Sequence, residues 1–202
     1  MAREVGRSLG SLLDSWIVRD AMTTILETPR LLMRPFTMDD LPWLIEMRTA
    51  EAVSRYMGGT RWQNPEALRK RMAFYIECWH KFDFGVCGMM LKETGEMIGT
   101  AGIQPLEDTG EVEVGYSIIE KYWGQGIGFE CAFAWLDHGF EHHGLERIVA
   151  VAHPDNKGSR RIMEKCGMQY ERTEEHYGQE TVFYAVSREE FRELKRGLDN
   201  KP

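Results

Sequence analysis

The 202-residue sequence has no long apolar run, few cysteines and fewer basic than acidic residues. No stretch approaches the roughly 18 apolar residues of a membrane-spanning helix, so no membrane partner is expected. The 4 cysteines lie far apart and form no C-x-x-C pair, which predicts buried thiols in a cytoplasmic protein without a disulfide framework. The net charge of −7 argues against nucleic acid as the main partner.

A metal centre and a secretion signal are also not indicated. His138 and His142 share one predicted helix, but they are not part of an H-E-x-x-H motif, and the cysteine spacing fits no zinc pattern. Asp14 and Arg19 interrupt the stretch that would form the apolar core of a signal peptide. We therefore expect no metal and a cytoplasmic location.

Length and composition suit one globular domain. The chain is 43 % hydrophobic and 28 % charged, as is typical of globular proteins. Residues 1–25 are weakly amphipathic and are predicted to form a helical extension, followed by a single domain over residues 26–202. The acidic net charge is compatible with a cationic substrate, but it does not separate one such substrate from another.

Hydrophobic periodicity divides the domain into strands and helices. The order is β-α-α-β-β-β-α-β-α-β-β, and the mixture of hairpins with β-α-β crossovers predicts an α+β (mixed α/β) fold with a mixed sheet flanked by helices. Strands are predicted over residues 31–36, 84–91, 97–106, 111–119, 147–152, 168–177 and 181–186. Helices are predicted from Thr37, from Asn64 to about Trp79, after Gly128, from Asn156 to Cys166 and from Arg188 to Arg196.

Three glycines at alternate positions follow the strand pattern 111–119 and precede a helix with an apolar stripe: Gly124, Gly126 and Gly128. Glycine lets the backbone approach a ligand closely, and a helix N-terminus offers unpaired N–H donors and partial positive charge. The segment therefore predicts a phosphate-binding turn, although a purely structural tight turn stays open. It is neither a Walker A nor a dinucleotide motif, because no Gly-Lys-Ser/Thr follows and hairpins precede it.

The motifs around this turn resemble those of one enzyme superfamily. They are Glu113-Val-Gly-Tyr116, Tyr122-Trp-Gly-Gln-Gly-Ile-Gly128 and the run from His153 to Met168. In this order, and over about residues 26–194, the chain resembles the GNAT acetyltransferases, most closely the RimJ/RimL-type N-acetyltransferases. The resemblance implies a GNAT fold, with a mostly antiparallel sheet of six or seven strands. It also implies acetyl-CoA as cosubstrate and direct transfer of the acetyl group to an amine, either a protein N-terminal α-amine or a small-molecule amine.

The resemblance also indicates how the cosubstrate is held. The superfamily pattern Q/R-x-x-G-x-G/A maps onto residues 123–128, with Trp123 in the place of Gln or Arg, so backbone N–H groups are expected to carry more of the pyrophosphate binding. The segment 156–165 carries four basic residues and one acidic residue, which suits a polyanion, although a solvated helix face is equally open. The expected binding residues are Ile118 and Ile119, through their backbones, with Trp123, Gly124, Gln125, Gly126, Ile127, Gly128, Asn156 and Arg161.

Two residues are expected to carry the proton transfers. Glu113 is the candidate general base, directly or through water, because a carboxylate on a half-buried strand facing a cleft has a raised pKa. Glu111 points the same way along the strand and is the alternative. The resemblance makes Ser159 the candidate donor to the leaving thiolate, with Tyr170, Tyr177 or water as substitutes.

Two other functions stay open at this point. A non-catalytic acyl-CoA-binding module that regulates a partner would use the same turn, as would a nucleotide-binding protein. The acid at Glu113 and the hydroxyl at Ser159 favour the enzyme. The sequence does not distinguish a monomer from a homodimer.

Overall fold

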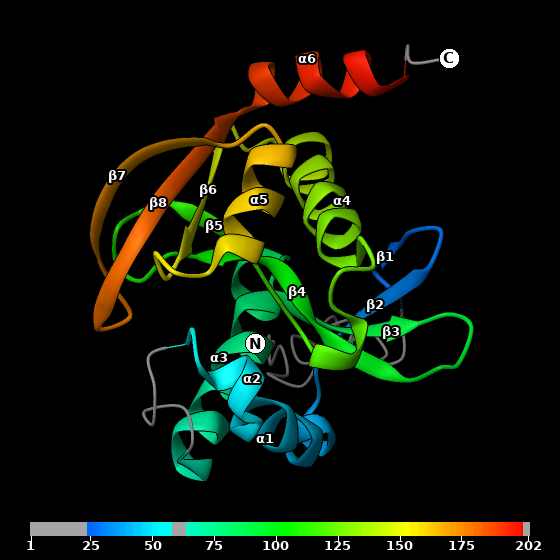
Figure 1. The fold of residues 1–202 in the computed structure, drawn as a ribbon. Coiled ribbons are helices and arrows are strands. Elements are labelled where there is room, and N and C mark those ends of the chain that lie inside the picture. Colours follow the sequence, from blue (N-terminus) through cyan, green and yellow to red (C-terminus); the bar gives the residue numbers. More distant parts are fainter. Residues whose placement is uncertain (1–23, 58–63, 200–202) are drawn as a thin grey trace, which may run out of the picture.

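The computed structural model describes residues 24–57 and 64–199 (Figure 1). The helical extension expected over residues 1–25 falls on residues outside these ranges, apart from Thr24 and Ile25, which are not helical. The first described element is β1 (Leu26–Glu27), a two-residue strand that pairs antiparallel with β2 (Leu31–Pro35).

The described residues form one eight-stranded sheet in the order β1-β2-β3-β4-β5-β6-β8-β7. Neighbouring strands are antiparallel except for β5 and β6, so the predicted mixed, mostly antiparallel sheet is confirmed. Seven strands match predicted ones, and β1 is the additional strand, too short for an alternation pattern to reveal. The remaining strands are β3 (Val86–Leu91), β4 (Met97–Pro105), β5 (Val112–Ile118), β6 (Arg147–Ala152), β7 (Gln169–His176) and β8 (Gln179–Ser187).

Polar caps begin the predicted helices. Asn64 accepts the Glu66 N–H at 2.9 Å, and Pro65 fills the first helical position. Thr37 opens a short 3-10 turn, Met38–Asp40, before the first α-helix, and a second such turn covers Glu120–Tyr122. The helices are α1 (Leu41–Thr49), α2 (Glu51–Ser54), α3 (Pro65–Phe82), α4 (Ile127–His142), α5 (Lys157–Lys165) and α6 (Arg188–Asp199). Within the described ranges, no helix combines the length and the apolar character needed to cross a membrane.

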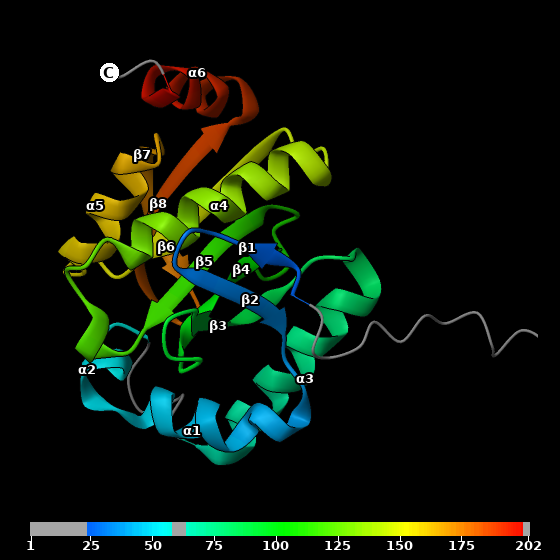
Figure 2. The same ribbon diagram turned by 90° about the vertical axis from the view of Figure 1, so that its right-hand side faces the viewer.

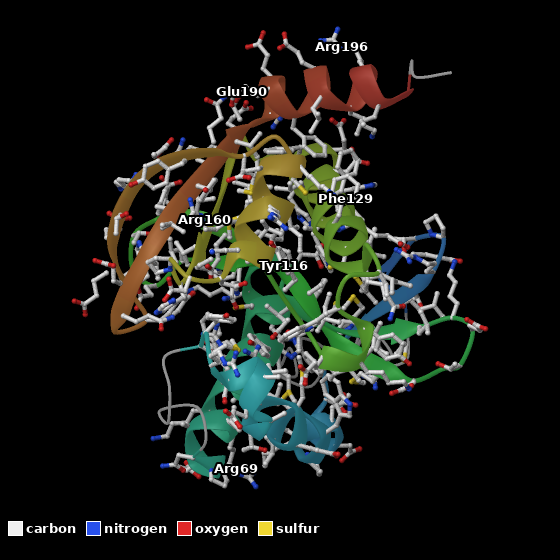
Figure 3. The ribbon with its side chains drawn as sticks, viewed as in Figure 1. Arg69, Tyr116, Phe129, Arg160, Glu190 and Arg196 are labelled. Carbon is white, nitrogen blue, oxygen red and sulfur yellow. The ribbon has the colours of Figure 1, made fainter. Side chains whose placement is uncertain are left out.

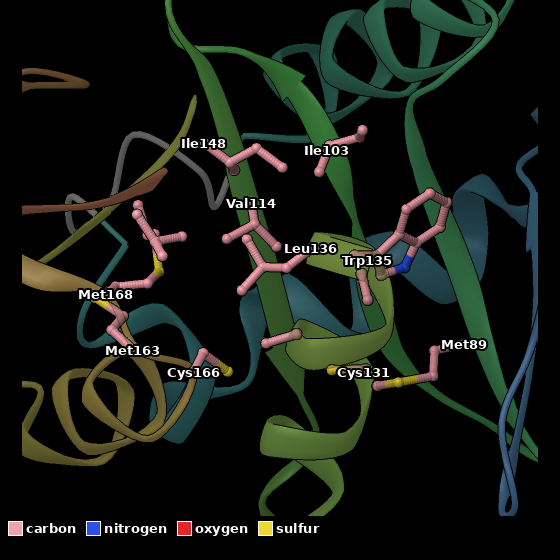
Figure 4. Close-up of a cluster of buried hydrophobic side chains, with 14 of the residues drawn as sticks. Met89, Ile103, Val114, Cys131, Trp135, Leu136, Ile148, Met163, Cys166 and Met168 are labelled. Atoms are coloured by element: carbon pink, nitrogen blue, oxygen red, sulfur yellow. The ribbon is translucent and has the colours of Figure 1, made fainter. Parts of the chain in front are cut away.

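Helices cover both faces of the sheet. Figures 1 and 2 show α1, α2 and α3 grouped together, away from α4 and α5, and α4 packs over β4, β5 and β6. Alternation along β5 sorts its side chains as predicted, because Val114 lies in the main core with Trp135 and Leu136 of α4 (Figure 4). Glu113 and Gly115 face the opposite way, into a cavity that α1 and α3 help to line.

The one parallel pair of strands positions the site. β5 and β6 are in register at Glu113 and Val149, and no other residue pair joins these two described strands. Beyond Glu113, β5 continues to pair with β4 on its other side as far as Ile118. The two strands therefore separate, and the edge of β5 that faces β6 is left without a ladder partner.

Candidate active site

Two hollows meet where β5 and β6 separate. A cavity of about 140 Å³ lies on the α3 side of the sheet, and a groove of about 630 Å³ follows the glycine turn and α5. A molecule in the groove can therefore reach one in the cavity at their junction. The residues that line both hollows are Tyr56, Met57, Tyr116, Val151, Ala152, His153 and Ser159.

Each glycine of the turn has a separate structural reason. Gly124 and Gly126 have φ values of 73° and 79°, in the left-handed region that favours glycine. Gly128 lies in the first turn of α4, where an added Cβ would be 2.6 Å from the Cδ1 atom of Ile162 in α5. Since α4 begins at Ile127, its first N–H groups have no acceptor one turn earlier and border the groove. The turn thus has the geometry of an anion-binding helix N-terminus.

A hairpin distant in sequence holds this turn. The Nη1 atom of Arg30 donates to the Gln125 carbonyl at 2.8 Å, and its Nε atom donates to Glu130 in α4 at 2.6 Å. The Thr28 hydroxyl donates to the other Glu130 oxygen, also at 2.6 Å. Sequence reasoning missed this clamp. The Gln125 side chain donates to the Lys121 carbonyl at 3.0 Å, and Gln125 is not among the residues that line the groove, so its expected binding role stays a prediction.

The backbone groups expected to line the cosubstrate arm are partly engaged already. The Trp123 indole N–H donates to the Ile118 carbonyl at 2.7 Å, and both residues line the groove. The Ile119 N–H donates to the Ile98 carbonyl at 3.0 Å, and Ile119 is not among the groove residues. The structure therefore places Trp123 and Ile118 at the groove but gives no support to a role for Ile119.

Basic side chains of α5 border the groove. Lys157, Arg161 and Lys165 line it, while Arg160 is turned toward β8, where its Nε atom donates to the Tyr184 hydroxyl at 3.3 Å (Figure 3). Asn156 caps α5 by accepting the Ser159 N–H at 3.1 Å and also lines the groove. Three cations and a helix N-terminus therefore surround one groove in an acidic protein.

Tyr116 and Ser159 meet at the junction. The Tyr116 hydroxyl lies 3.1 Å from the Ser159 Oγ atom and donates to the Ser159 carbonyl at 3.2 Å. Burial raises the pKa of Tyr116 well above its ordinary value, so the phenol stays protonated. Tyr116 had no predicted role. The sequence feature that could have identified Tyr116 as a site residue is its position directly after Gly115, in the motif that begins at Glu113.

Glu113 is buried in the cavity wall, with 4 % of its surface exposed. Its Oε1 atom accepts hydrogen bonds from the Gln104 amide at 2.6 Å and from the Tyr177 hydroxyl. Burial raises the pKa of Glu113 above its ordinary value, although these two hydrogen bonds act to lower it. A carboxylate with a raised pKa is a stronger base for an amine proton.

The alternative residues are placed elsewhere. Glu111 pairs with Arg147 at 3.4 Å and lines neither hollow. Tyr170 is 53 % exposed and its hydroxyl contacts Thr173, so it does not reach the junction. Tyr177 lies in the cavity but is bonded to Glu113, not placed beside Ser159.

The cysteines are buried, as predicted, and none lines either hollow. Burial raises the pKa of the Cys166 thiol to about 12 and that of Cys78 to about 11. These thiols therefore stay protonated near neutral pH and are poor nucleophiles.

Comparison with known proteins gives consistent matches. A family model described as an acetyltransferase (GNAT) domain matches residues 30–169. The uncharacterized N-acetyltransferase YoaA of Bacillus subtilis is 31 % identical over 151 residues, which cover 74 % of this chain and 85 % of that protein. An acetyltransferase structure from Agrobacterium tumefaciens has a TM-score of 0.72 at 29 % identity, covering 84 % of this chain and 96 % of that one. Mycobacterium smegmatis RimJ, in complex with CoA-disulfide, has a TM-score of 0.67 at 22 % identity, covering 84 % and 88 %, a likeness of fold alone.

Proposed function

Since the chain belongs to the acetyltransferase (GNAT) family, as its motifs predicted, we propose that this acetyl-CoA-dependent N-acetyltransferase transfers the acetyl group directly to an amine held in the cavity at Glu113. The observation that carries the proposal is the junction of the two hollows. A buried carboxylate lies on its cavity side, and a Tyr116–Ser159 hydroxyl pair lies where the groove enters.

The groove suits acetyl-CoA. Lys157, Arg161 and Lys165 supply three positive charges, and the N–H groups at the start of α4 supply donors for a pyrophosphate. The groove then continues to Ser159 at the junction. Bound acetyl-CoA supplies a thioester carbonyl that an amine can attack, with a thiolate as the leaving group. The Trp123 indole donor is already bonded to Ile118, which leaves pyrophosphate binding to the backbone and the cations.

Glu113 takes the proton that the amine loses. An ammonium ion cannot attack a carbonyl, and a model Lys amine has a pKa of about 10.4, so a base is needed near neutral pH. Burial brings the pKa of Glu113 closer to neutrality, while the hydrogen bonds from Gln104 and Tyr177 fix the orientation of its carboxylate. An intervening water between Glu113 and the amine would serve the same purpose.

Ser159 passes a proton to the thiolate while its Oγ atom takes one from water in the groove, and Tyr116 positions the Ser159 hydroxyl. The Tyr116 hydroxyl contacts both the carbonyl and the Oγ atom of Ser159, which restricts the rotation of that hydroxyl. Transfer without an acetyl-enzyme is supported by the cysteines, which are buried away from both hollows.

The direct test is a panel of small amines and peptides incubated with acetyl-CoA. Thiol release should be detected together with a gain of one acetyl group on the acceptor by mass spectrometry. If acetyl-CoA binds but no member of the panel is acetylated, the non-catalytic acyl-CoA-binding module becomes the better reading.

A further inference from the structure

One buried and one half-buried arginine line the cavity that contains the candidate base. Arg48 of α1 is only 6 % exposed and lines the same cavity as Glu113, as does Arg71 of α3. The Nη2 atom of Arg48 donates to the Tyr75 hydroxyl at 3.2 Å and lies 3.5 Å from the Thr100 hydroxyl. The Arg71 guanidinium lies over the Tyr75 ring, 4.9 Å from its centroid. Two positive charges therefore flank a single phenol in the cavity wall.

Arg48 has no acidic partner among the described residues. Its guanidinium contacts the Met57 sulfur, Tyr75 and Thr100, and no Asp or Glu forms an ion pair with it in the described parts of the chain. Burial lowers the pKa of Arg48, and the positive charge of Arg71 adds to that effect. A buried cation is costly unless an anion compensates it.

The sheet register gives the cavity two chemically different ends. Thr100 and Gln104 lie on one face of β4, and Gln104 is opposite Glu113. Thr100 and Gln104 are four residues apart on the strand, so their backbones are separated by about 13 Å. Long side chains extend into the cavity from both of these ends. Between them, an added Cβ on Gly115 would meet no atom within 4 Å, so the space above this glycine is open. One end presents the Arg48 guanidinium and hydroxyl donors, and the other presents the Glu113 base. The Arg71 guanidinium lies between them, 4.9 Å from the centroid of the Tyr75 ring and 5.5 Å from that of the Tyr177 ring.

We propose that the acceptor is a small amine that also carries a carboxylate, as an amino acid does, with the carboxylate bound by Arg48 and Arg71 and the amine directed to Glu113. Guanidinium groups match the geometry of a carboxylate. A cavity of about 140 Å³ is well below the roughly 300–1,000 Å³ of drug-sized sites, which favours a small molecule over a protein segment. The first residue of a protein, in contrast, has its α-carboxyl group in a peptide bond. This inference rests on the proposed function.

The test compares matched pairs of acceptors that differ in the carboxylate alone. Leucine is compared with leucinamide and 3-methylbutylamine, and phenylalanine with phenylalaninamide and phenethylamine. A series of ω-amino acids varies the distance between the two groups. We expect kcat/KM to be at least about tenfold higher for the preferred carboxylate-bearing amine than for its partners. Equal values across every pair would overturn the inference and leave the proposed function intact, whereas failure of all amines despite acetyl-CoA binding would remove both.

The Arg48→Met variant removes the guanidinium charge and keeps a long side chain at this position. This variant should lose most of the preference for the carboxylate while the KM for acetyl-CoA stays unchanged, and Arg48→Lys should restore part of it. Arg69→Met is the matched control, because Arg69 is an exposed residue near the start of α3 (Figure 3). The Tm of Arg48→Met, measured without substrate, should not fall, since the buried charge has no ion-pair partner to lose. A lowered Tm with an equal loss of activity on both members of each pair would make Arg48 a structural residue and overturn the inference.

Discussion

The hydroxyl oxygen of Tyr116 lies 3.1 Å from the Oγ atom of Ser159, although the two residues are 43 positions apart. Tyr116 comes from β5 and Ser159 from α5, which follows β6. Because β5 and β6 separate after Glu113, the long Tyr116 side chain of β5 can reach the short Ser159 side chain of α5, the helix that follows β6. The contact therefore depends on the opening between the strands.

Tyr116→Phe removes this contact and keeps the ring in the core. We expect kcat to fall by about tenfold, because Ser159 loses the group that orients it, while the KM for the acceptor changes little. Ser159→Ala should cost at least as much, and the double variant should cost no more than Ser159→Ala alone, since the two hydroxyls act as one unit. Strictly additive losses in steady-state kinetics would show that the two residues act independently.

Glu113→Gln should lower turnover by about 10²–10⁴-fold, because the amide cannot accept the amine proton. Glu111→Gln is a matched control at the residue that precedes β5, since Glu111 pairs with Arg147 outside both hollows. We expect the control to keep the wild-type rate and both variants to bind acetyl-CoA normally in calorimetry. Wild-type turnover by Glu113→Gln across the pH range would remove the carboxylate from the reaction.

Tyr177→Phe should move the acid limb of the pH–rate profile. The Tyr177 hydroxyl donates to the Glu113 carboxylate and so holds its pKa down against the effect of burial. Without this donor the charged form is less stabilised, and the pKa of Glu113 rises further. The acid limb of kcat/KM should therefore shift to higher pH. A shift to lower pH would contradict the assignment of this limb to Glu113.

Gly115→Ala should narrow the cavity without disturbing the strand. Gly115 has no left-handed φ, and its missing Cβ faces open space. We expect the acceptor KM to rise by about tenfold or more, while the KM for acetyl-CoA stays the same. Gly197→Ala, another glycine with open space around it, is the control on α6 and should leave both constants unchanged. If the Gly115 variant has wild-type acceptor kinetics, the acceptor does not occupy this part of the cavity.

His176 should make stability depend on pH. Its ring nitrogens lie 2.9 Å from Glu107 and 2.8 Å from Glu174. Burial lowers the pKa of His176, but the two carboxylates outweigh burial and raise the pKa above 6.5. The protonated ring therefore stabilises the fold fully below the unfolded-state pKa, and this contribution is lost as the pH rises through the folded-state value.

Urea unfolding of the wild type and of His176→Gln measures this contribution. The wild type should lose on the order of 1 kcal/mol more than the variant between about pH 6 and pH 9. Parallel pH curves for the two proteins would mean that His176 does not titrate between these values.

The fold could be predicted from the sequence because its core follows simple periodicities. The alternating strand predicted over residues 111–119 is β5, and the capped helix predicted from Asn156 to Cys166 is α5. The motifs predicted that the glycine turn, Glu113 and Ser159 belong to one site. In the structure the turn lines the groove, Glu113 lines the cavity, and Ser159 lines both. These features depend on short stretches of chain.

The remaining parts of the site depend on packing between distant segments. Alternation assigned Tyr116 to the core face, which holds for its ring, but only the separated strands let its hydroxyl reach Ser159. Arg48 and Arg71 occupy helix positions that are usually solvated. Arg48 is buried and Arg71 is half-buried, and both line the cavity because α1 and α3 cover the sheet. Arg30 acts on the glycine turn across 95 positions. No local pattern contains that information.

The register pair of Glu113 and Val149 has a mechanical consequence. Since these residues are the point at which the described parts of β5 and β6 are joined, any twisting of one half of the sheet against the other pivots beside the carboxylate. Trp123, beyond the other end of β5, borders the groove. We therefore expect the opening between the strands to widen near Trp123 when a bulky cosubstrate binds, with little movement at the candidate base Glu113.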